Sequence, residues 1–255
     1  STFHNDLFEK TYPEIELVTP GQPVHGVAAM YCLGWYYDKD GKIDLSKNPM
    51  ETKSQPMQKS AFDILGLEYV ETRPRIEVPT LERKNKIAIA IHATCQAKYW
   101  NNPTGWQEVV DWCSQNGYEV VILSKEQDGY MGNLYPNGAR QLQAGPLNLV
   151  IDELASSKAF IGIGSGLSWL SWATGTPTIL ISGFSEAYTE PLVNTRRISA
   201  PAGKCSGCFN SHKLDPSDWN WCPVAKDTER MFECSRSITA ETVIAELKSV
   251  LESYR

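Results

Sequence analysis

The sequence predicts an α/β protein whose second half forms a parallel sheet. Short runs dominated by Ile and Val, at residues 87–91, 119–123 and 178–181, have the length and composition of buried strands. Stretches with helical spacing separate these runs. Strands that are apolar on both faces and alternate with amphipathic helices are typical of a parallel sheet covered by helices on both sides.

The other elements of the second half follow from periodicity and turn signals. Helical spacing and apolar composition predict three helices and one further strand: helices over 105–115, 147–154 and 168–173, and a strand over 159–162. Gly117 supplies a stop for the first of these helices. Thr239 can cap a last helix. That helix carries one apolar stripe, formed by Val243, Ile244, Leu247, Val250 and Leu251.

The first half has fewer regular signals. Residues 6–12 have helical spacing, and residues 14–18 read as a short strand. Residues 60–66 read as a helix that ends at Gly66. We therefore expect both helix and strand in this half.

A domain boundary is expected near residues 80–86. Prolines make residues 73–80 extended, and the clearer rhythm of strands and helices starts after them. We therefore expect one domain over residues 1–83 and another over residues 84–255. About eighty residues are few for a complete nucleotide-binding domain, because a single βαβ unit already takes about thirty. The first half is thus expected to be an incomplete α/β domain.

The charge balance excludes several classes of partner. The chain has 255 residues, a formal charge of −6 and no dense block of Lys and Arg, so it lacks the electrostatic footprint of a protein that binds nucleic acid or an anionic membrane. No apolar run reaches the roughly 18 residues that a membrane span needs, and the first eight residues are unlike a signal peptide. We expect a cytoplasmic protein.

A glycine loop follows the predicted strand over residues 159–162. Residues 164–168, Gly-Ser-Gly-Leu-Ser, open the next helix at the edge where open parallel sheets bind ligands. The glycines allow the backbone to approach a ligand, and the hydroxyls of Ser165 and Ser168 can donate to an oxyanion. The loop therefore suits a phosphate group. The alternative is a tight turn in which a serine only caps the helix.

A lysine is expected at the same edge. Lys98 follows the first strand of the second half, within residues 92–106. A point cation in this place can offset the charge of a leaving phosphate group. The alternative is an ordinary solvated loop lysine. We favour the functional interpretation because two candidate sites converge at one edge of the predicted sheet.

Four of the seven cysteines are clustered. They give the spacing C-x2-C-x13-C-x11-C: Cys205, Cys208, Cys222 and Cys234. The first pair can chelate one ion, and the other two thiolates complete a tetrahedron. The alternative is a pair of disulfides, which a cytoplasmic location disfavours. Thiolates accept zinc and iron alike, so the spacing leaves the metal open. The others read as isolated buried thiols: Cys32, Cys95 and Cys113.

These residues resemble the ADP-heptose-dependent glycosyltransferases of GT-B architecture, which have two Rossmann-like domains. Within that group the chain is most similar to the bacterial autotransporter heptosyltransferases. The resemblance covers about residues 60–255 and is carried by four stretches: His92-Ala-Thr, Lys98-Tyr-Trp, residues 164–177 and residues 181–185. It implies a GT-B-like fold in which the second half binds the nucleotide sugar.

The resemblance also implies roles for particular residues. Lys98 would face the donor sugar and its phosphates, with Thr94 as a nearby hydroxyl. The diphosphate would lie against the glycine loop, which comprises Gly164, Ser165, Gly166, Leu167 and Ser168. The nucleoside would be gripped at the end of the second strand, at Ser124, Lys125 and Glu126.

Two departures from the related lipopolysaccharide enzymes place the chain nearer the autotransporter branch. Gly164 stands where those enzymes have an acidic residue, and Trp169 where they have a histidine. The autotransporter branch also carries a four-cysteine iron finger in this part of the chain. The resemblance therefore implies one iron ion held within residues 205–234. A closed site of this kind has no open coordination position, so we expect a structural role for it.

The implied activity is transfer of heptose from ADP-heptose to a hydroxyl of an autotransporter protein. We expect serine as the acceptor, inversion at the anomeric carbon, and a homo-oligomer. Enzymes of this type begin with a strand that carries the catalytic base, and no such strand precedes Asp6, so we expect either a fragment or a shortened relative. No base is assigned, although Asp38, Asp40 and Asp44 are available in a turn-like stretch.

Two other functions remain open. One is a GT-B transferase that uses another nucleotide sugar, because no residue reads adenine directly. The other is a non-catalytic module that binds a nucleotide sugar and assists assembly through its metal finger.

Overall fold

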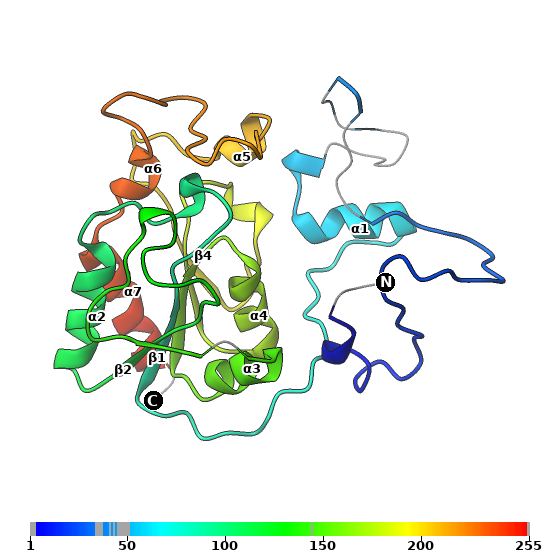
Figure 1. Ribbon diagram of the computed structural model, residues 1–255, viewed down its shortest axis with the longest axis horizontal. Coiled ribbons are helices and arrows are strands. Elements are labelled where there is room, and N and C mark those ends of the chain that lie inside the picture. The colour runs from blue at the N-terminus through cyan, green and yellow to red at the C-terminus, as the bar shows by residue number, and fades with distance from the viewer. Residues whose placement is uncertain are drawn as a thin grey trace. The chain divides into compact units, whose positions relative to one another are not determined.

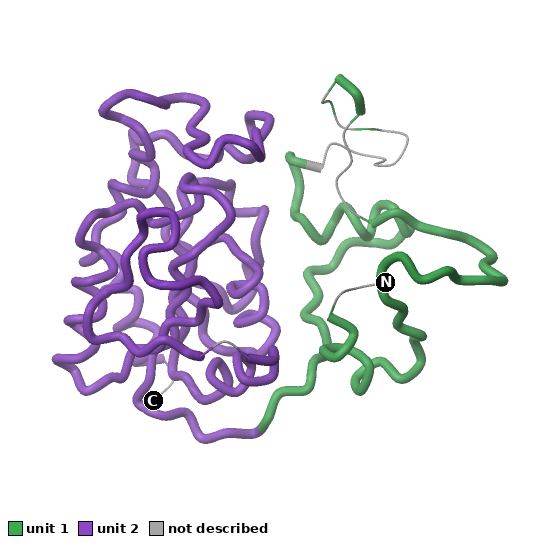
Figure 2. The backbone as a smooth tube through the Cα atoms, in the orientation of Figure 1, with its two compact units in different colours: residues 1–79 green, residues 80–255 purple. Residues whose placement is uncertain are grey.

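The computed structural model describes residues 4–33, 38–40, 42, 44, 52–143 and 145–253. The chain forms two compact units, unit 1 over Ser1–Pro79 and unit 2 over Thr80–Arg255, which Figure 2 shows in different colours.

Unit 1 has little regular structure in its described part. Its elements are two short 3-10 helices, η1 (Asn5–Leu7) and η2 (Thr52–Ser54), and one helix, α1 (Met57–Leu65). Gly66 ends α1 in a left-handed conformation with φ of 68°, as predicted.

The strand predicted over residues 14–18 is wrong. These residues form no strand, and the predicted helix over 6–12 is only η1 followed by turns. A strand needs a neighbour to pair its backbone groups, and the described part of unit 1 offers none. The expected α/β character of this half is therefore not seen in the described residues.

Unit 2 is built on one parallel sheet. Its six strands are β1 (Lys86–Ala90), β2 (Glu119–Ile122), β3 (Arg140–Gln141), β4 (Ala159–Ile163), β5 (Thr178–Ile181) and β6 (Thr195–Ile198). The order across the sheet is β3-β2-β1-β4-β5-β6, and every neighbouring pair is parallel. The chain builds outward from β1 in one direction and from β4 in the other. A crevice is expected beyond the carboxyl ends of β1 and β4, where the order reverses.

Helices cover both faces of this sheet (Figure 1). Helices α2 (Gly105–Gln115) and α7 (Ala240–Ser253) share a core with the isoleucines of one face. On the other face, α3 (Leu147–Ala155) and α4 (Gly166–Thr174) pack around the fully buried Phe160. Two short helices, α5 (Cys208–Ser211) and α6 (Glu233–Arg236), belong to a segment that crosses above the carboxyl edge.

The predicted parallel sheet is confirmed, with four of its strands and four helices near their expected positions. Helix α4 starts at Gly166, two residues before the predicted start. Strands β3 and β6 were not predicted. Both lie at the edges of the sheet and have mostly polar sequences, Arg-Gln and Thr-Arg-Arg-Ile; β3 is exposed, and only Ile198 of β6 is buried. Edge strands commonly lack the apolar run that marks a buried strand.

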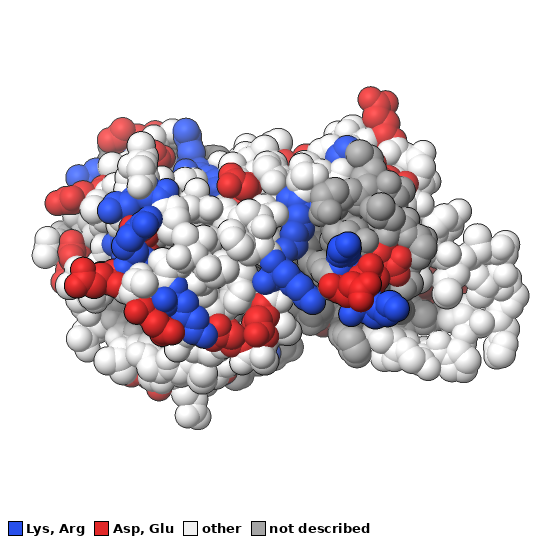
Figure 3. All heavy atoms as spheres, turned by 90° about the horizontal axis from the view of Figure 1, so that it is seen from above, with Lys and Arg blue, Asp and Glu red and all other residues white. Residues whose placement is uncertain are grey.

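Two further expectations can be compared with the described residues. Cys95 and Cys113 are buried as expected, but Cys32 is exposed, so it is not an isolated buried thiol. No helix in the described ranges is long and apolar enough to cross a membrane. On the face of unit 2 drawn in Figure 3, acidic and basic side chains are interspersed.

Candidate functional site

The glycine loop connects β4 to α4 at the carboxyl edge of the sheet. Ser165 is the N-cap of α4, with φ of −150° and ψ of 170°, yet its side chain makes no capping hydrogen bond. Its Oγ is buried and has no hydrogen-bond partner among the described residues. A buried hydroxyl normally has a partner. The alternative interpretation, in which a serine of the loop only caps the helix, therefore does not describe Ser165.

Ser168 has a different place. Its Oγ donates a hydrogen bond to the carbonyl oxygen of Ile163 at 2.6 Å, and the side chain is buried. Ser168 thus ties the first turn of α4 back to β4, while Gly166 and Leu167 lie at the start of the helix. Gly166 is open, since a Cβ there would meet no heavy atom within 4 Å.

A buried ion pair lies against Gly164. A Cβ on Gly164 would stand 2.8 Å from Oε1 of Glu190. The Glu190 carboxylate accepts a hydrogen bond from Ser185 Oγ at 2.5 Å and pairs with Arg197, whose side chain is only 10 % exposed. Arg197 also donates to the carbonyl of Ser185. A side chain at position 164 would therefore have to displace a carboxylate that is held in a buried ion pair.

Lys98 lies in η3 (Gln96–Lys98), on the loop that follows β1. Its Nζ is 3.4 Å from the Oγ1 of Thr94 and 5.6 Å from the centroid of the Phe184 ring. Because β1 and β4 are parallel neighbours, the loop of Lys98 and the glycine loop leave the sheet at the same edge. The structure thus brings the two predicted candidate sites to adjoining strands.

The next loop along the edge begins at Ser124, after β2. Its Oγ is 2.8 Å from Nδ1 of His92, and it accepts a hydrogen bond from the backbone N–H of Glu126 at 3.1 Å. Tyrosine rings surround His92, with Tyr135 nearest at 5.3 Å between centroids. Burial lowers the pKa of His92 below its ordinary value of 6.5. The sequence offered no role for this histidine, although it belongs to one of the motifs that carried the resemblance.

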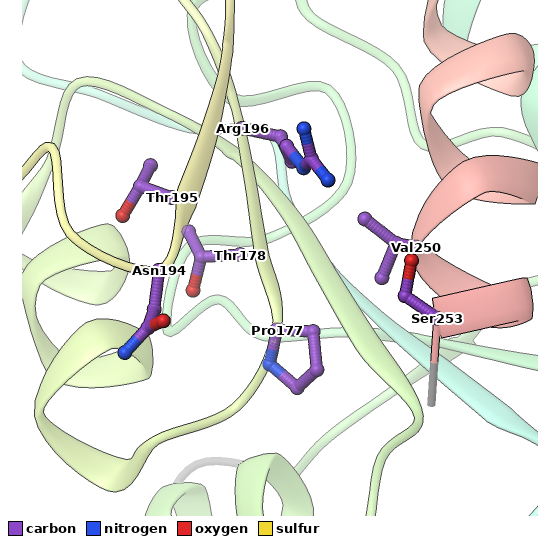
Figure 4. A pocket seen from close by; sticks show the side chains of 7 residues that line it. All are labelled: Pro177, Thr178, Asn194, Thr195, Arg196, Val250 and Ser253. Carbon is purple, nitrogen blue, oxygen red and sulfur yellow. The ribbon is translucent and has the colours of Figure 1, made fainter. Parts of the chain in front are cut away.

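Two hollows are found in the described part of unit 2. One, of about 490 Å³, borders this edge, because Ile91 at the end of β1 and Gln96 and Tyr99 of the Lys98 loop line it together with side chains of α2. Its amides already bond one another: Gln96 with Asn133, and Gln107 with the backbone of Asn137. The other, of about 550 Å³, lies at the opposite edge, where β5 and β6 begin and α7 ends (Figure 4). It is remote from the strand ends that carry Lys98 and the glycine loop.

The four clustered cysteines are free thiols in the structure, so the alternative of two disulfides is not seen. Burial, aided by the charges of neighbouring thiols, raises the pKa of Cys208 to about 11 and that of Cys234 to about 12. Cys205 and Cys222 are among those neighbours, so the four side chains interact with one another. Within the described ranges, however, no group of three or more ligand side chains is gathered closely enough to hold a metal ion.

The donor set nevertheless suits a soft metal. Four reduced, mutually interacting thiols, with no other charged ligand required, are the chemistry that zinc and iron accept. Gly207, in a left-handed conformation with φ of 68°, turns the chain between the first two cysteines. The chemistry of the four thiols therefore fits the metal ion that the sequence implies. Among the described residues, however, the sulfur atoms are not arranged as a coordination shell.

Comparison with known proteins identifies related chains. The family model for glycosyltransferase family 9 (heptosyltransferase) matches residues 36–216. The autotransporter heptosyltransferase BAHTCr of Citrobacter rodentium is 38% identical over 247 residues, which cover 93% of this chain and 59% of the relative. The chain thus spans 59% of the length of this curated relative. A 28% identical relative from Burkholderia thailandensis is described as an inactive autotransporter heptosyltransferase, BimC.

Solved structures agree with this relationship. The crystal structure of TibC from enterotoxigenic Escherichia coli, described as an iron-containing dodecameric glycosyltransferase, matches with a TM-score of 0.89 and 35% identity, over 98% of this chain and 66% of that one. The same protein in complex with ADP-D-β-D-heptose matches with a TM-score of 0.88.

Proposed function

Because the chain belongs to glycosyltransferase family 9, the heptosyltransferase family, we propose that it binds ADP-heptose in unit 2 and takes part in transferring the heptose to an autotransporter protein. The acceptor group is a protein hydroxyl, taken to be serine. The transfer inverts the configuration of the anomeric carbon, and the working form is a homo-oligomer. The names and descriptions of the relatives above support the choice of donor, the class of acceptor and the oligomeric form. The inversion and the choice of serine rest on the resemblance of the sequence motifs.

The observation that carries the proposal is the buried hydroxyl of Ser165 at the N-terminus of α4, which has no hydrogen-bond partner in the part of the chain that the structure describes. A helix N-terminus presents unpaired N–H groups and a partial positive charge, which favour an anionic group. The position beside the reversal of strand order is the place where open parallel sheets bind nucleotides. A diphosphate lying here would satisfy the Ser165 hydroxyl and would contact the open backbone of Gly166.

The chemical step in this proposal is the departure of ADP as the acceptor oxygen attacks. Negative charge grows on the diphosphate as the glycosidic bond breaks, and the ammonium of Lys98 stabilises that charge together with the N–H groups of α4. Thr94, 3.4 Å from the ammonium, helps to hold Lys98 in place. Ser124 and Glu126 are proposed to contact the nucleoside, since they lie on the neighbouring strand end. No base is assigned to the acceptor proton.

Replacement of Lys98 tests this role. Lys98→Ala is expected to lower turnover by about a hundredfold or more while the dissociation constant of ADP-heptose rises much less, because the charge that Lys98 stabilises develops only in the transition state. Isothermal titration and labelled-sugar transfer measure the two quantities. Lys158→Ala, which removes a lysine packed over Tyr118, is the control. Equal losses of binding and turnover would reduce Lys98 to a ligand-positioning residue.

The cysteines are proposed to hold one iron ion, with zinc as the alternative metal. Cys205, Cys208, Cys222 and Cys234 would be its ligands. The iron-containing relative and the chemistry of the donor set support this assignment. Four thiolates leave no open coordination position, so the ion would cross-link residues 205–234 and would take no part in transfer.

A non-catalytic module is the second candidate. The relative described as inactive supports it, because its sequence is 28% identical to this chain. Incubation of this chain with labelled ADP-heptose and an acceptor protein separates the two functions. Binding of donor without transfer would favour the module, and transfer would exclude it. Competition with other nucleotide sugars tests the choice of donor.

A further inference from the structure

The cysteine segment, residues 205–234, contacts the loop of Lys98. We propose that Phe184 is a positioning residue for Lys98, and that the cysteine segment holds both the ring and the loop in place. The proposal rests on the function assigned to Lys98 above. It gives the cysteine segment a second task, the placement of a charge at the candidate site.

Phe184 contacts the side chain of Lys98. The ammonium lies over the ring, with Nζ 5.6 Å from its centroid, and the Phe184 side chain is buried. The face of an aromatic ring attracts a cation within about 6 Å of its centroid. Apart from the ring, the ammonium contacts the Thr94 hydroxyl at 3.4 Å. The ring and the hydroxyl together restrict where the charge stands.

Two aromatic side chains support the Phe184 ring. Phe209 stacks on Phe184 with centroids 5.2 Å apart, and Trp221 meets it edge-on at 5.9 Å. The backbone N–H of Phe209 also donates to the carbonyl of Phe184 at 3.0 Å. Both Phe209 and Trp221 belong to the cysteine segment. Phe184 therefore cannot shift without disturbing that segment.

The cysteine segment also touches the backbone on either side of these residues. Gly183 packs so tightly against Cys234 that an added Cβ would stand 2.7 Å from the Cys234 backbone. On the side of the lysine, the backbone N–H of Gln96 donates to the carbonyl of Trp219 at 2.9 Å. The indole N–H of Trp219 returns a hydrogen bond to Gln96 Oε1 at 3.2 Å. The segment thus contacts the backbone next to both residues of the pair, at Gly183 beside Phe184 and at Gln96 near Lys98.

Nuclear magnetic resonance tests the placement without reference to activity. Lysines of the full chain are converted to ¹³C-dimethyl-lysine, which keeps the positive charge, and the Lys98 signal is identified by its loss in Lys98→Arg. The ring current of Phe184 is expected to move that signal upfield. Phe184→Leu should abolish the displacement, Phe184→Tyr should keep it, and Phe209→Leu should reduce it, because the ring loses its support.

A matched control exists elsewhere in unit 2. The Lys158 ammonium lies 5.9 Å from the ring centroid of Tyr118, a pair of the same kind away from the candidate site. Tyr118→Leu should move the Lys158 signal and leave that of Lys98 unchanged. An unchanged Lys98 signal in folded Phe184→Leu and Phe209→Leu would overturn the proposal.

Kinetics then test the consequence. Phe184→Leu is expected to lower kcat by between about twofold and thirtyfold, which is the range of a cation–π contact. The dissociation constant of ADP-heptose should change by less than about twofold, Phe184→Tyr should recover most of the loss, and Phe184→Leu should add nothing to Lys98→Ala. Additive losses would show that Phe184 acts independently of Lys98, against the proposal. Failure of the unaltered chain to bind ADP-heptose would instead refute the proposed function, and the Lys98 signal would still decide the placement.

Discussion

At the scale of single residues, the candidate site is shaped by side chains that are distant in sequence. Glu190 occupies the space that a Cβ on Gly164 would need, and Glu190 is held there by Arg197 and Ser185. Removing one partner of a buried ion pair leaves an uncompensated charge, which is costly. The glycine loop therefore depends on a pair of charges contributed by β6 and the loop before it.

Substitutions of two glycines distinguish the contribution of this loop to stability from its contribution to ligand binding. Gly164→Ala is expected to lower the free energy of unfolding by about 1–3 kcal/mol, because its Cβ would stand 2.8 Å from Glu190. Gly166→Ala should leave stability nearly unchanged, since its Cβ meets nothing, but should weaken ADP binding by occupying the space of the diphosphate. Urea unfolding and titration with ADP measure the two effects. Equal behaviour of the two variants would contradict the arrangement.

The pKa of His92 predicts a dependence of stability on pH. Burial lowers this pKa below 6.5, so at intermediate pH the unfolded chain binds a proton that the folded chain does not. The contribution of His92 to the free energy of unfolding is thus fully present above pH 6.5 and declines as pH falls below it, by at most about 1.4 kcal/mol per pH unit.

His92→Gln is expected to make the loss of stability between pH 7.5 and about 5.5 shallower, measured as the shift of the urea midpoint. The exposed His25→Gln is the control and should leave the slope as it is. A slope that steepens in His92→Gln would mean that the side chain is charged in the folded chain.

At the scale of elements, α4 and the cysteine segment are the parts to which we assign the proposed phosphate and metal sites. Helix α4 places its N-terminus at the carboxyl edge because the turn from β4 is short and rich in glycine. The cysteine segment has only two four-residue helices, so regular backbone hydrogen bonds contribute little to its rigidity. A metal cross-link would give this segment the rigidity that its secondary structure does not provide.

Metal analysis of the purified chain tests this element. One equivalent of iron or zinc per chain is expected, and Cys208→Ser or Cys234→Ser should lose it, because a tetrahedral thiolate site loses most of its affinity with one ligand. Thiolate-to-iron charge-transfer absorption distinguishes iron from zinc. Cys32→Ser, which removes an exposed thiol in unit 1, should keep the metal. Retention of a full equivalent in both ligand variants would contradict the assignment.

At the scale of the whole molecule, the two units differ in what stabilises them. The three clusters of buried apolar side chains found among the described residues all lie in unit 2. We propose that residues 80–255 are the folding unit that binds the nucleotide sugar, close to the predicted boundary at residues 83 and 84. These clusters contain no described residue of unit 1.

A fragment of residues 80–255 is therefore expected to unfold in one cooperative transition, with a urea midpoint near that of the main transition of the full chain. A fragment that starts at residue 87 is the matched control. It lacks Lys86, whose buried side chain pairs with Glu153, and should lose about 3–5 kcal/mol. Failure of the longer fragment to fold would show that unit 1 contributes to the core.

The periodicity of the sequence was sufficient to predict the parallel sheet and the helices that cover it. Residues 178–181 form β5 within the predicted bounds, and 105–115 form α2, because a buried strand and an amphipathic helix each leave a pattern in consecutive residues. The same local rules failed for residues 14–18, where no neighbouring strand is found in the described part of unit 1. They also missed β3 and β6, whose positions at the edges remove the apolar pattern.

The candidate site shows the same division. The order of strands and loops was enough to predict that Lys98 and the glycine loop lie at one edge of the sheet, because the carboxyl ends of parallel strands point the same way. Only the tertiary structure could place Phe184 beneath Lys98, Glu190 beside Gly164, and the cysteine segment against the loop of Lys98 and the loop of Phe184. These contacts join residues far apart in the chain, and no local pattern in a single sequence records which distant side chains will meet.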